Sequence, residues 1–240
     1  YGGHGAAFGS GAVGGLISLT NEALTSNDLL GINLSAGSWG AWLAEMKLQY
    51  GFDKLRFSTK VFYQTADNNY RYRLNEGSPE RNQVHHHLQN EGLLQEVMWA
   101  INEREQLTAR VWYQYADREI PPTSTQTTSK SSQQDDNLRV SLQWMRKGEK
   151  FSWQCNTAWL EESIDYQDSL ILLYTRNHFR TWLAEAATSF RLFPGMSITG
   201  GLYTEAVEAT SANYDAGTSR NQYAAFTSAG LVHGDWVWRL

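Results

Sequence analysis

The sequence predicts an all-β fold, an antiparallel transmembrane β-barrel of which the chain holds about 10 to 11 strands. Apolar and polar residues alternate in run after run, tight turns alternate with longer polar links, and 13% of the residues are aromatic. No run approaches the roughly 18 apolar residues that a membrane-spanning helix needs. The net charge of −5 comes without a basic block, so the composition gives no sign of nucleic-acid binding.

The chain opens with a glycine-rich stretch, YGGHGAAFGSGAVGGLISLT, from Tyr1 to Thr20. Glycine is kept where backbones approach closely or take a positive φ angle. A flexible linker would leave Leu16, Ile17 and Leu19 exposed. The stretch therefore indicates crowded backbone that leads into a strand.

Ten predicted strands follow, each with apolar residues at alternate positions, which is typical of a strand with one buried and one polar face. In the strand at 107–115, for example, Leu107, Val111 and Tyr113 alternate with Arg110 and Gln114. The predicted strands occupy 30–38, 42–50, 55–63, 93–101, 107–115, 138–144, 151–159, 179–190, 196–207 and 222–232, and an eleventh begins at Trp236.

The connections between these strands differ in length at the two ends. Tight turns are predicted at 51–54, 102–105, 146–149, 193–195 and 233–235, and long polar links at 66–84, 117–136, 161–177 and 208–221. Short turns at one end and long loops at the other are typical of outer-membrane barrels. A β-propeller has a similar spacing of repeats, but each blade needs four strands where this sequence offers two.

The polar faces and the aromatic residues also favour a barrel over a soluble all-β binding or adhesion module, either a sandwich or a propeller. The polar faces carry side chains that suit a wet or plugged lumen: Arg56, Lys60, Arg110, Arg139, Gln143 and Gln154. Aromatic residues gather at strand ends, as two interfacial girdles require. They are Tyr50, Phe52, Trp144, Phe151, Phe190 and Phe193 near the short turns, and Trp39, Trp42, Tyr63, Trp159 and Trp182 near the long links.

The opening stretch resembles the end of the plug domain of TonB-dependent outer-membrane receptors, where a YG…GSGAVGGxIxxxT pattern closes the plug. The segment NDLLGINLSAGSWGAWLAEMKLQYGFDKLRFSTKVFYQTADNNYRYR resembles the first three barrel strands of the same family. The resemblance implies that residues 1–28 are the C-terminal end of a plug domain and that 29–240 are the N-terminal half of a barrel of about 22 strands.

The resemblance also implies a function. It predicts an active-transport receptor in the outer membrane of a Gram-negative bacterium, embedded in outer-membrane lipid and energised by the TonB complex. The expected ligand is a scarce small-molecule chelate, an iron-siderophore or cobalamin. Because a half barrel leaves two strand edges unpaired, we expect the chain to form an edge-to-edge homodimer or to pair with a complementary chain.

The first long link carries the candidate site residues. Tyr70, Arg71, Tyr72 and Arg73 can stack on and ion-pair with an anionic chelate. The oxygen side chains of the same segment, DNNYRYR, can bind calcium. A solvated loop also explains this composition.

A run of three histidines, His85–His87, follows the first long link. If the run His85–His87 is a strand, its first and third imidazoles share a face, so His85 and His87 are candidate metal ligands. Asp67 and Asn68 are candidate metal ligands through their side-chain oxygens. No catalytic motif is present, and we expect no enzyme activity.

The apolar run 170–174 predicts an extended loop hairpin. Cys155 is expected to be a lipid-facing structural thiol.

Overall fold

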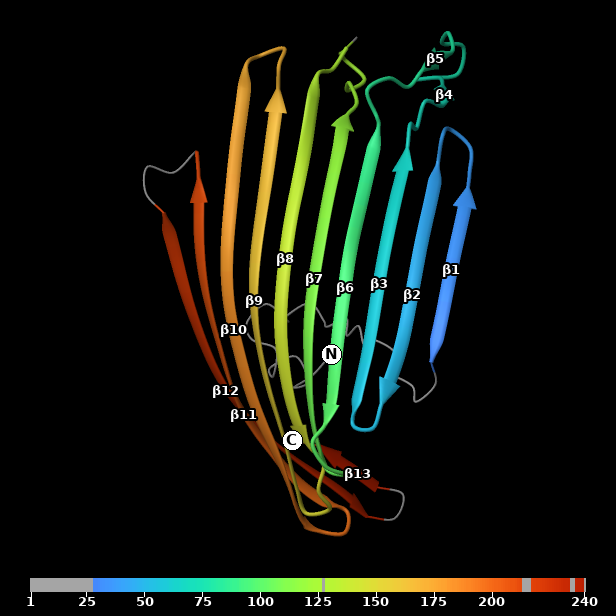
Figure 1. Cartoon of the computed structure of the whole chain (residues 1–240). Coiled ribbons are helices and arrows are strands. Elements are labelled where there is room, and N and C mark those ends of the chain that lie inside the picture. Colours follow the sequence, from blue (N-terminus) through green and yellow to red (C-terminus); the bar gives the residue numbers. More distant parts are fainter. Residues whose placement is uncertain (1–27, 127, 213–216, 234–235, 240) are drawn as a thin grey trace.

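The computed structural model describes residues 28–126, 128–212, 217–233 and 236–239. Eleven strands form one open antiparallel sheet in the order β1-β2-β3-β6-β7-β8-β9-β10-β11-β12-β13 (Figure 1). Two short strands, β4 and β5, form a separate pair. The predicted end of a plug domain, 1–28, lies outside the described residues except for Asp28. The described part of the chain contains no helix capable of spanning a lipid bilayer.

The strand predictions are confirmed, and each strand pairs with the next one along the chain in the large sheet. The strands are β1 (Leu29–Ala36), β2 (Trp42–Phe52), β3 (Leu55–Ala66), β4 (Arg71–Tyr72), β5 (Arg81–Asn82), β6 (Leu88–Ala100), β7 (Glu105–Ile120), β8 (Ser131–Arg146), β9 (Phe151–Asp168), β10 (Leu173–Phe193), β11 (Met196–Ser211), β12 (Thr218–His233) and β13 (Trp236–Arg239).

The connections at one end of the sheet, the turn end, are as tight as predicted: β2 and β3 are separated only by 53–54, and β10 and β11 only by 194–195. At the opposite end, the loop end, three of the four predicted long links are wrong. The strands continue into them and leave connections of 121–130, 169–172 and 212–217. Only the link after β3, at 67–87, is a long loop, and it carries β4 and β5. The predicted hairpin at 170–174 is confirmed, because β9 and β10 stay paired up to Asp168 and Leu173.

The two faces of the sheet differ in chemistry. Strand register places Leu107 opposite Trp144, Trp144 opposite Cys155, and Cys155 opposite Ala186, so these side chains share one face, the apolar face. Arg110 belongs to the other face, the polar face, as do the remaining polar side chains predicted to face a lumen: Arg56, Lys60, Arg139, Gln143 and Gln154. Both face assignments made from the sequence are confirmed.

Burial is reversed relative to a soluble protein. The buried side chains within the large sheet all lie on the polar face: Gln49, Ser58, Ala66, Glu96, Thr108 and Ser131. Large side chains on the apolar face are exposed, up to 79% for Tyr223 and 74% for Leu34. A soluble sandwich buries its apolar faces against each other, so this single sheet excludes the sandwich, and its strand order excludes the propeller.

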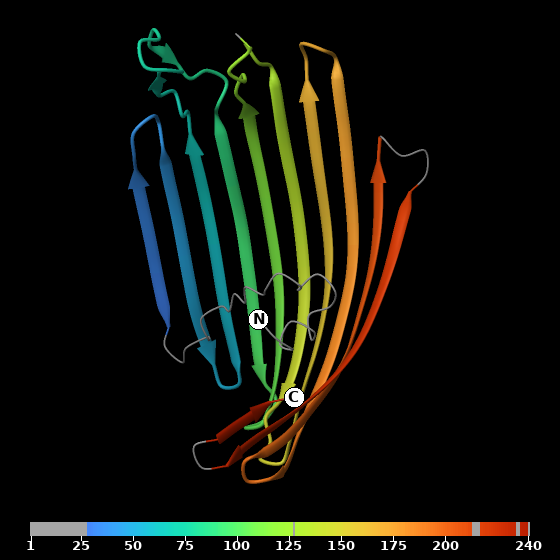
Figure 2. The ribbon, with the colours of Figure 1, turned by 180° about the vertical axis from the view of Figure 1, so that it is seen from behind.

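The sheet is curved and open (Figures 1 and 2). Its edges are β1 and β13, and among the described residues these two strands do not pair with each other. Closure of ten or eleven strands into a small barrel is therefore not observed.

Candidate functional site

The predicted ligand-binding residues lie together at the loop end, in the connection between β3 and β6 (Figure 1). β4 and β5 pair antiparallel, with Arg71 opposite Asn82 and Tyr72 opposite Arg81. The backbone N–H of Gln83 donates to the carbonyl of Tyr70 at 2.7 Å, which extends this pairing. The four residues 70–73 are thus presented by a small hairpin rather than by a loop without pairing.

Tyr70 is the centre of an aromatic cluster. Its ring centroid lies 5.7 Å from that of Trp39, 6.2 Å from that of Tyr72 and 6.2 Å from that of His86, each in an edge-to-face arrangement. Trp39 comes from the β1–β2 connection, where its φ angle is +59°. The sequence indicated Trp39 only as a girdle residue, since nothing local predicts its contact with Tyr70.

The two arginines of the hairpin remain available to an anion. Arg71 faces Glu80 at 3.9 Å between Nη1 and Oε2, with side chains 72% and 48% exposed, so this ion pair is weak. Arg73 is exposed and has no ion-pair partner among the described residues. Aromatic rings and exposed guanidinium groups are side chains that can stack on and ion-pair with an anion.

The segment His85–His87 is irregular and not a strand, so the argument that paired His85 with His87 on one strand face is wrong. His85 has a φ angle of +56°. Its Nε2 lies 2.7 Å from the carbonyl oxygen of Ser131, and its Nδ1 lies 3.2 Å from Oε1 of Glu119. Both neighbours are hydrogen-bond acceptors, so each ring nitrogen of His85 already lies against a partner in the protein.

The other predicted metal ligands have partners of their own. Nδ1 of His87 lies 3.3 Å from Oδ1 of Asp67, and Nδ2 of Asn68 donates to the carbonyl of His86 at 3.1 Å. In the chain as described, no three His, Cys, Asp or Glu side chains are grouped to hold a metal ion. The metal and calcium assignments therefore stay predictions.

These contacts join several connections into one rim. The backbone N–H groups of Asp67 and Asn68 donate to the carbonyl of Trp39 at 3.0 and 3.1 Å, and that of His87 donates to Oε2 of Glu119 at 3.0 Å. Glu119, near the end of β7, was not predicted, because its role depends on a register that only the folded sheet defines. The segments on both sides of the hairpin are thus bonded to the β1–β2 connection and to β7.

Below the rim, the polar face carries a network of ion pairs and amide hydrogen bonds. Arg139 donates from Nη2 to Glu162 at 2.7 Å and also stacks on Trp112, 4.9 Å from its ring centroid. Further pairs join Arg110 to Glu96, Arg220 to Glu205, Gln143 to Asn156 and Asn156 to Glu185. A continuous polar wall of this kind suits a wet interior and not a packed apolar core.

An open antiparallel sheet with one apolar and one polar face defines a segment of a membrane β-barrel wall. The sequence matches no known family profile and no curated protein. Among solved structures, a siderophore receptor, PiuA of Acinetobacter baumannii, superimposes over 87% of this chain with a TM-score of 0.60 and 9% identity. This chain covers 39% of PiuA. It covers 38% of BauA, a ferric preacinetobactin receptor of the same organism.

BauA matches 81% of this chain with a TM-score of 0.59 and 9% identity. The copper transporter OprC matches 86% of this chain with a TM-score of 0.53 and 12% identity, and this chain covers 43% of OprC. These neighbours are TonB-dependent outer-membrane receptors. The chain therefore has the barrel fold of that class and spans less than half of the length of these structures.

Proposed function

We propose that the chain is part of a receptor in the outer membrane of a Gram-negative bacterium that imports a scarce small-molecule chelate. The observation that carries this proposal is the pairing of an exposed apolar face with a polar, charged face on one sheet. A barrel wall between lipid and a wet interior uses both faces. The aromatic and arginine cluster at the loop end adds a receptor surface at the side where such barrels carry their extracellular loops.

The proposed ligand is an anionic iron chelate, with cobalamin as the alternative, and uptake is energised through the TonB complex. Support for an anionic ligand comes from Arg71 and Arg73, which alternate with Tyr70 and Tyr72 along the chain. In the described structure Arg71 has a weak ion pair with Glu80, and the rings of Tyr70 and Tyr72 contact each other edge to face. The fold neighbours include receptors for siderophores and a copper transporter, so transport of a metal or its chelate is in keeping with the fold.

The test is a binding and growth experiment with the full-length protein that contains this chain. Cells that lack it should grow poorly on a ferric siderophore as sole iron source, and the wild-type gene should restore growth. The double variant Tyr70→Ala with Arg73→Ala should weaken binding of that siderophore by about tenfold or more, since a stacking and a charge-assisted contact are lost.

Arg104→Ala is the matched control, because it removes the same charge from the turn end of the sheet. It should leave binding unchanged. Normal growth of the deletion strain on every ferric chelate, on cobalamin and on copper-limited medium would contradict the import proposal. Unchanged siderophore binding in the double variant would contradict only the assigned binding residues.

A further inference from the structure

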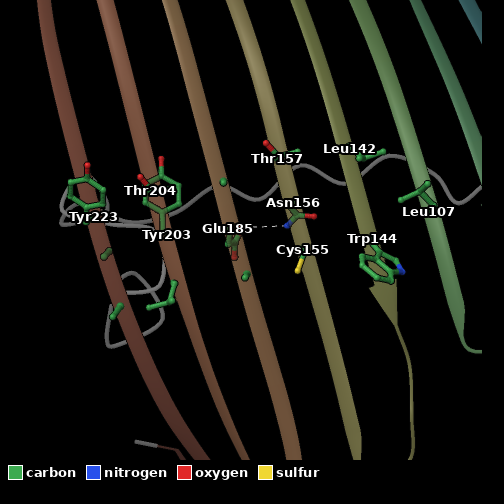
Figure 3. A pocket seen from close by; sticks show the side chains of 15 residues that line it. Leu107, Leu142, Trp144, Cys155, Asn156, Thr157, Glu185, Tyr203, Thr204 and Tyr223 are labelled. Atoms are coloured by element: carbon green, nitrogen blue, oxygen red, sulfur yellow. Dashed lines mark hydrogen bonds between the residues drawn. The ribbon is translucent and has the colours of Figure 1, made fainter.

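The apolar face is not evenly filled. A hollow of about 780 Å³ lies on it across β7 to β12 (Figure 3). Figure 3 shows Trp144 on one side of the hollow, Tyr223 on the other and Cys155 between them. Elsewhere on the face, large side chains such as Ile32, Val111 and Trp99 stand out from the sheet.

Strand register explains the shape of this hollow. One row across the strands reads Trp144, Cys155, Ala186, Leu202, Ala225, and the next row reads Leu142, Thr157, Ala184, Thr204, Tyr223. In both rows the members on β9 and β10 are small, and the large members are Trp144 and Leu142 on β8, Leu202 on β11 and Tyr223 on β12. The hollow is therefore a groove that runs along β9 and β10, with walls on β8 and on β11 and β12.

Aromatic residues close both ends of the groove. Trp159 lies opposite Trp182 at the loop end, and Trp153, which lies opposite Thr188 and in ring contact with Trp144, stands at the turn end. The interval between these rows, from Trp182 to Thr188, is about 20 Å long at 3.4 Å per residue. That interval covers about the depth of one leaflet, which is half of the 30 Å hydrocarbon core.

Charge begins at the ends of this interval. On the apolar face the first charged pairs are Glu161 with Arg180, beyond Trp159 and Trp182, and Glu105 with Arg146, which lies in the row of Trp153. The groove itself continues the uncharged band that faces hydrocarbon. The Thr157 hydroxyl already donates to the Leu183 carbonyl, so a floor formed mainly by Cys155, Ala184 and Ala186 offers water few hydrogen-bond partners, and an empty groove forfeits contact with its lining atoms.

We propose that the groove binds one acyl chain of a membrane lipid from the leaflet on the loop side, as a fixed part of the barrel wall. The inference rests on the proposed membrane location of the apolar face. A chain in the groove fills the space left by Cys155, Thr157, Ala184 and Ala186, and the tryptophan row at the loop end forms the mouth through which it descends. Other lipids against the face exchange freely, because they meet a surface of protruding side chains.

The experiment measures lipid retained by the full-length protein after extraction from the membrane and extensive washing in mild detergent. Ala186→Phe places a ring on the groove floor. Ala109→Phe makes the same change on the apolar face of β7, outside the groove, and is the control. Wild type and the Ala109→Phe variant should each retain about one lipid, and Ala186→Phe should retain about tenfold less, since contact with at least two methylenes is lost.

Equal retention in the two variants, or no retained lipid in wild type, would overturn the groove assignment. Membrane fractionation of wild type separates this outcome from failure of the proposed function. If the protein is not in the outer membrane, the proposed location fails. If it is there and retention does not depend on Ala186, only the lipid site fails.

A second measurement does not depend on how Ala186→Phe folds. Cys155 is the sole cysteine of this chain and lies on the groove floor. Its alkylation by N-ethylmaleimide in detergent should be slow in lipid-retaining protein and about tenfold faster after complete delipidation. A cysteine introduced by Val111→Cys in a Cys155→Ser background, on the open part of the apolar face, should react at the same rate in both preparations; equal rates for Cys155 would also overturn the site.

Discussion

At the scale of single residues, the parity of a position within its strand decides whether its side chain meets lipid or the interior. Val111 is 40% exposed on the apolar face. Three positions later, Gln114 donates from Nε2 to Oδ1 of Asn90 at 3.1 Å on the polar face. The same substitution at these two positions should therefore change the free energy of unfolding by very different amounts.

Val111→Arg should lower the free energy of unfolding by about 2 to 4 kcal/mol, because a guanidinium near the midplane of the bilayer loses its hydration. Gln114→Arg should be nearly neutral, since the polar face already holds Arg110 and Arg139. Unfolding in urea from lipid vesicles measures both values. Equal losses at the two positions would refute the assignment of the faces.

A second residue-scale prediction concerns the ion pair beyond the membrane-facing band. Arg176 donates to both carboxylate oxygens of Asp165, from Nε at 2.6 Å and from Nη2 at 2.5 Å. These hydrogen bonds hold the pKa of Asp165 below its usual range, against a smaller opposing effect of desolvation. A lowered pKa means that the pair stabilises the folded strands above the ordinary aspartate pKa and that this contribution disappears as the pH falls through the lowered value.

The β9–β10 connection at 169–172 should therefore become more protease-sensitive below about pH 4. Pulse proteolysis across pH measures this sensitivity. Asp165→Asn should make the connection equally sensitive at neutral pH, with a small effect because Arg176 is 61% exposed. A wild-type profile without pH dependence would show that the pair does not hold the strands together.

At the scale of elements, alternation predicted the strands wherever one face is apolar, and it failed where both faces are polar. The start of β8, SSQQDDN from Ser131, has no alternation and was predicted as loop. Cross-strand partners extend the sheet there: Arg118 pairs with Asp135, and Gln134 donates to Asp117. Such partners are distant in sequence, so a local pattern cannot reveal them.

The candidate site shows the same division. Residues 70–73 were identified from local composition, and the structure places them together. Trp39 and Glu119 were missed as parts of the rim because they come from other connections. The histidine prediction failed because it assumed a strand where the backbone of His85 takes a left-handed conformation.

Glycine and phenylalanine pair across strands on the polar face, which the sequence does not reveal. Phe62 lies opposite Gly92, and Phe226 lies opposite Gly201. A Cβ atom at Gly92 would come within 2.5 Å of the Phe62 ring and 3.0 Å of the Tyr113 carbonyl oxygen. The rings therefore occupy the space that these glycines leave, an arrangement that supports glycine within a strand.

Gly92→Val should destabilise the sheet by about 1 to 3 kcal/mol, because the new side chain displaces the ring. Gly31→Val is the control, since a Cβ atom there meets nothing closer than 4.0 Å. Thermal unfolding in detergent measures both variants. If Phe62→Ala does not relieve the cost of Gly92→Val, the ring is not its cause.

At the scale of the whole molecule, β1 and β13 leave two unpaired edges in the described sheet. Produced as these 240 residues, the polypeptide should associate edge to edge, as a two-fold dimer or with a complementary chain, because unpaired N–H and C=O groups are costly in lipid. Chemical cross-linking and light scattering in detergent measure the assembly. A stable, ordered monomer would contradict the prediction.

Proline substitutions in β1 give this experiment a control. Backbone groups of adjacent residues point to opposite sides of a strand, so one of Asn33→Pro and Leu34→Pro removes an outward N–H and the other breaks pairing with β2. The first should weaken association and leave the sheet intact. The second should also disturb the circular dichroism of the strands.

The hairpin order of the large sheet has a consequence for how such walls diversify. Each strand of the large sheet is hydrogen-bonded to the sheet strands that precede and follow it in the chain. No pairing in the described sheet therefore joins strands that are separated by another strand of that sheet. Duplicating or deleting one hairpin would leave all the other pairings intact and would change the circumference of a closed wall by about 10 Å. Channel width can thus evolve in steps of two strands, while the loops on each hairpin change independently.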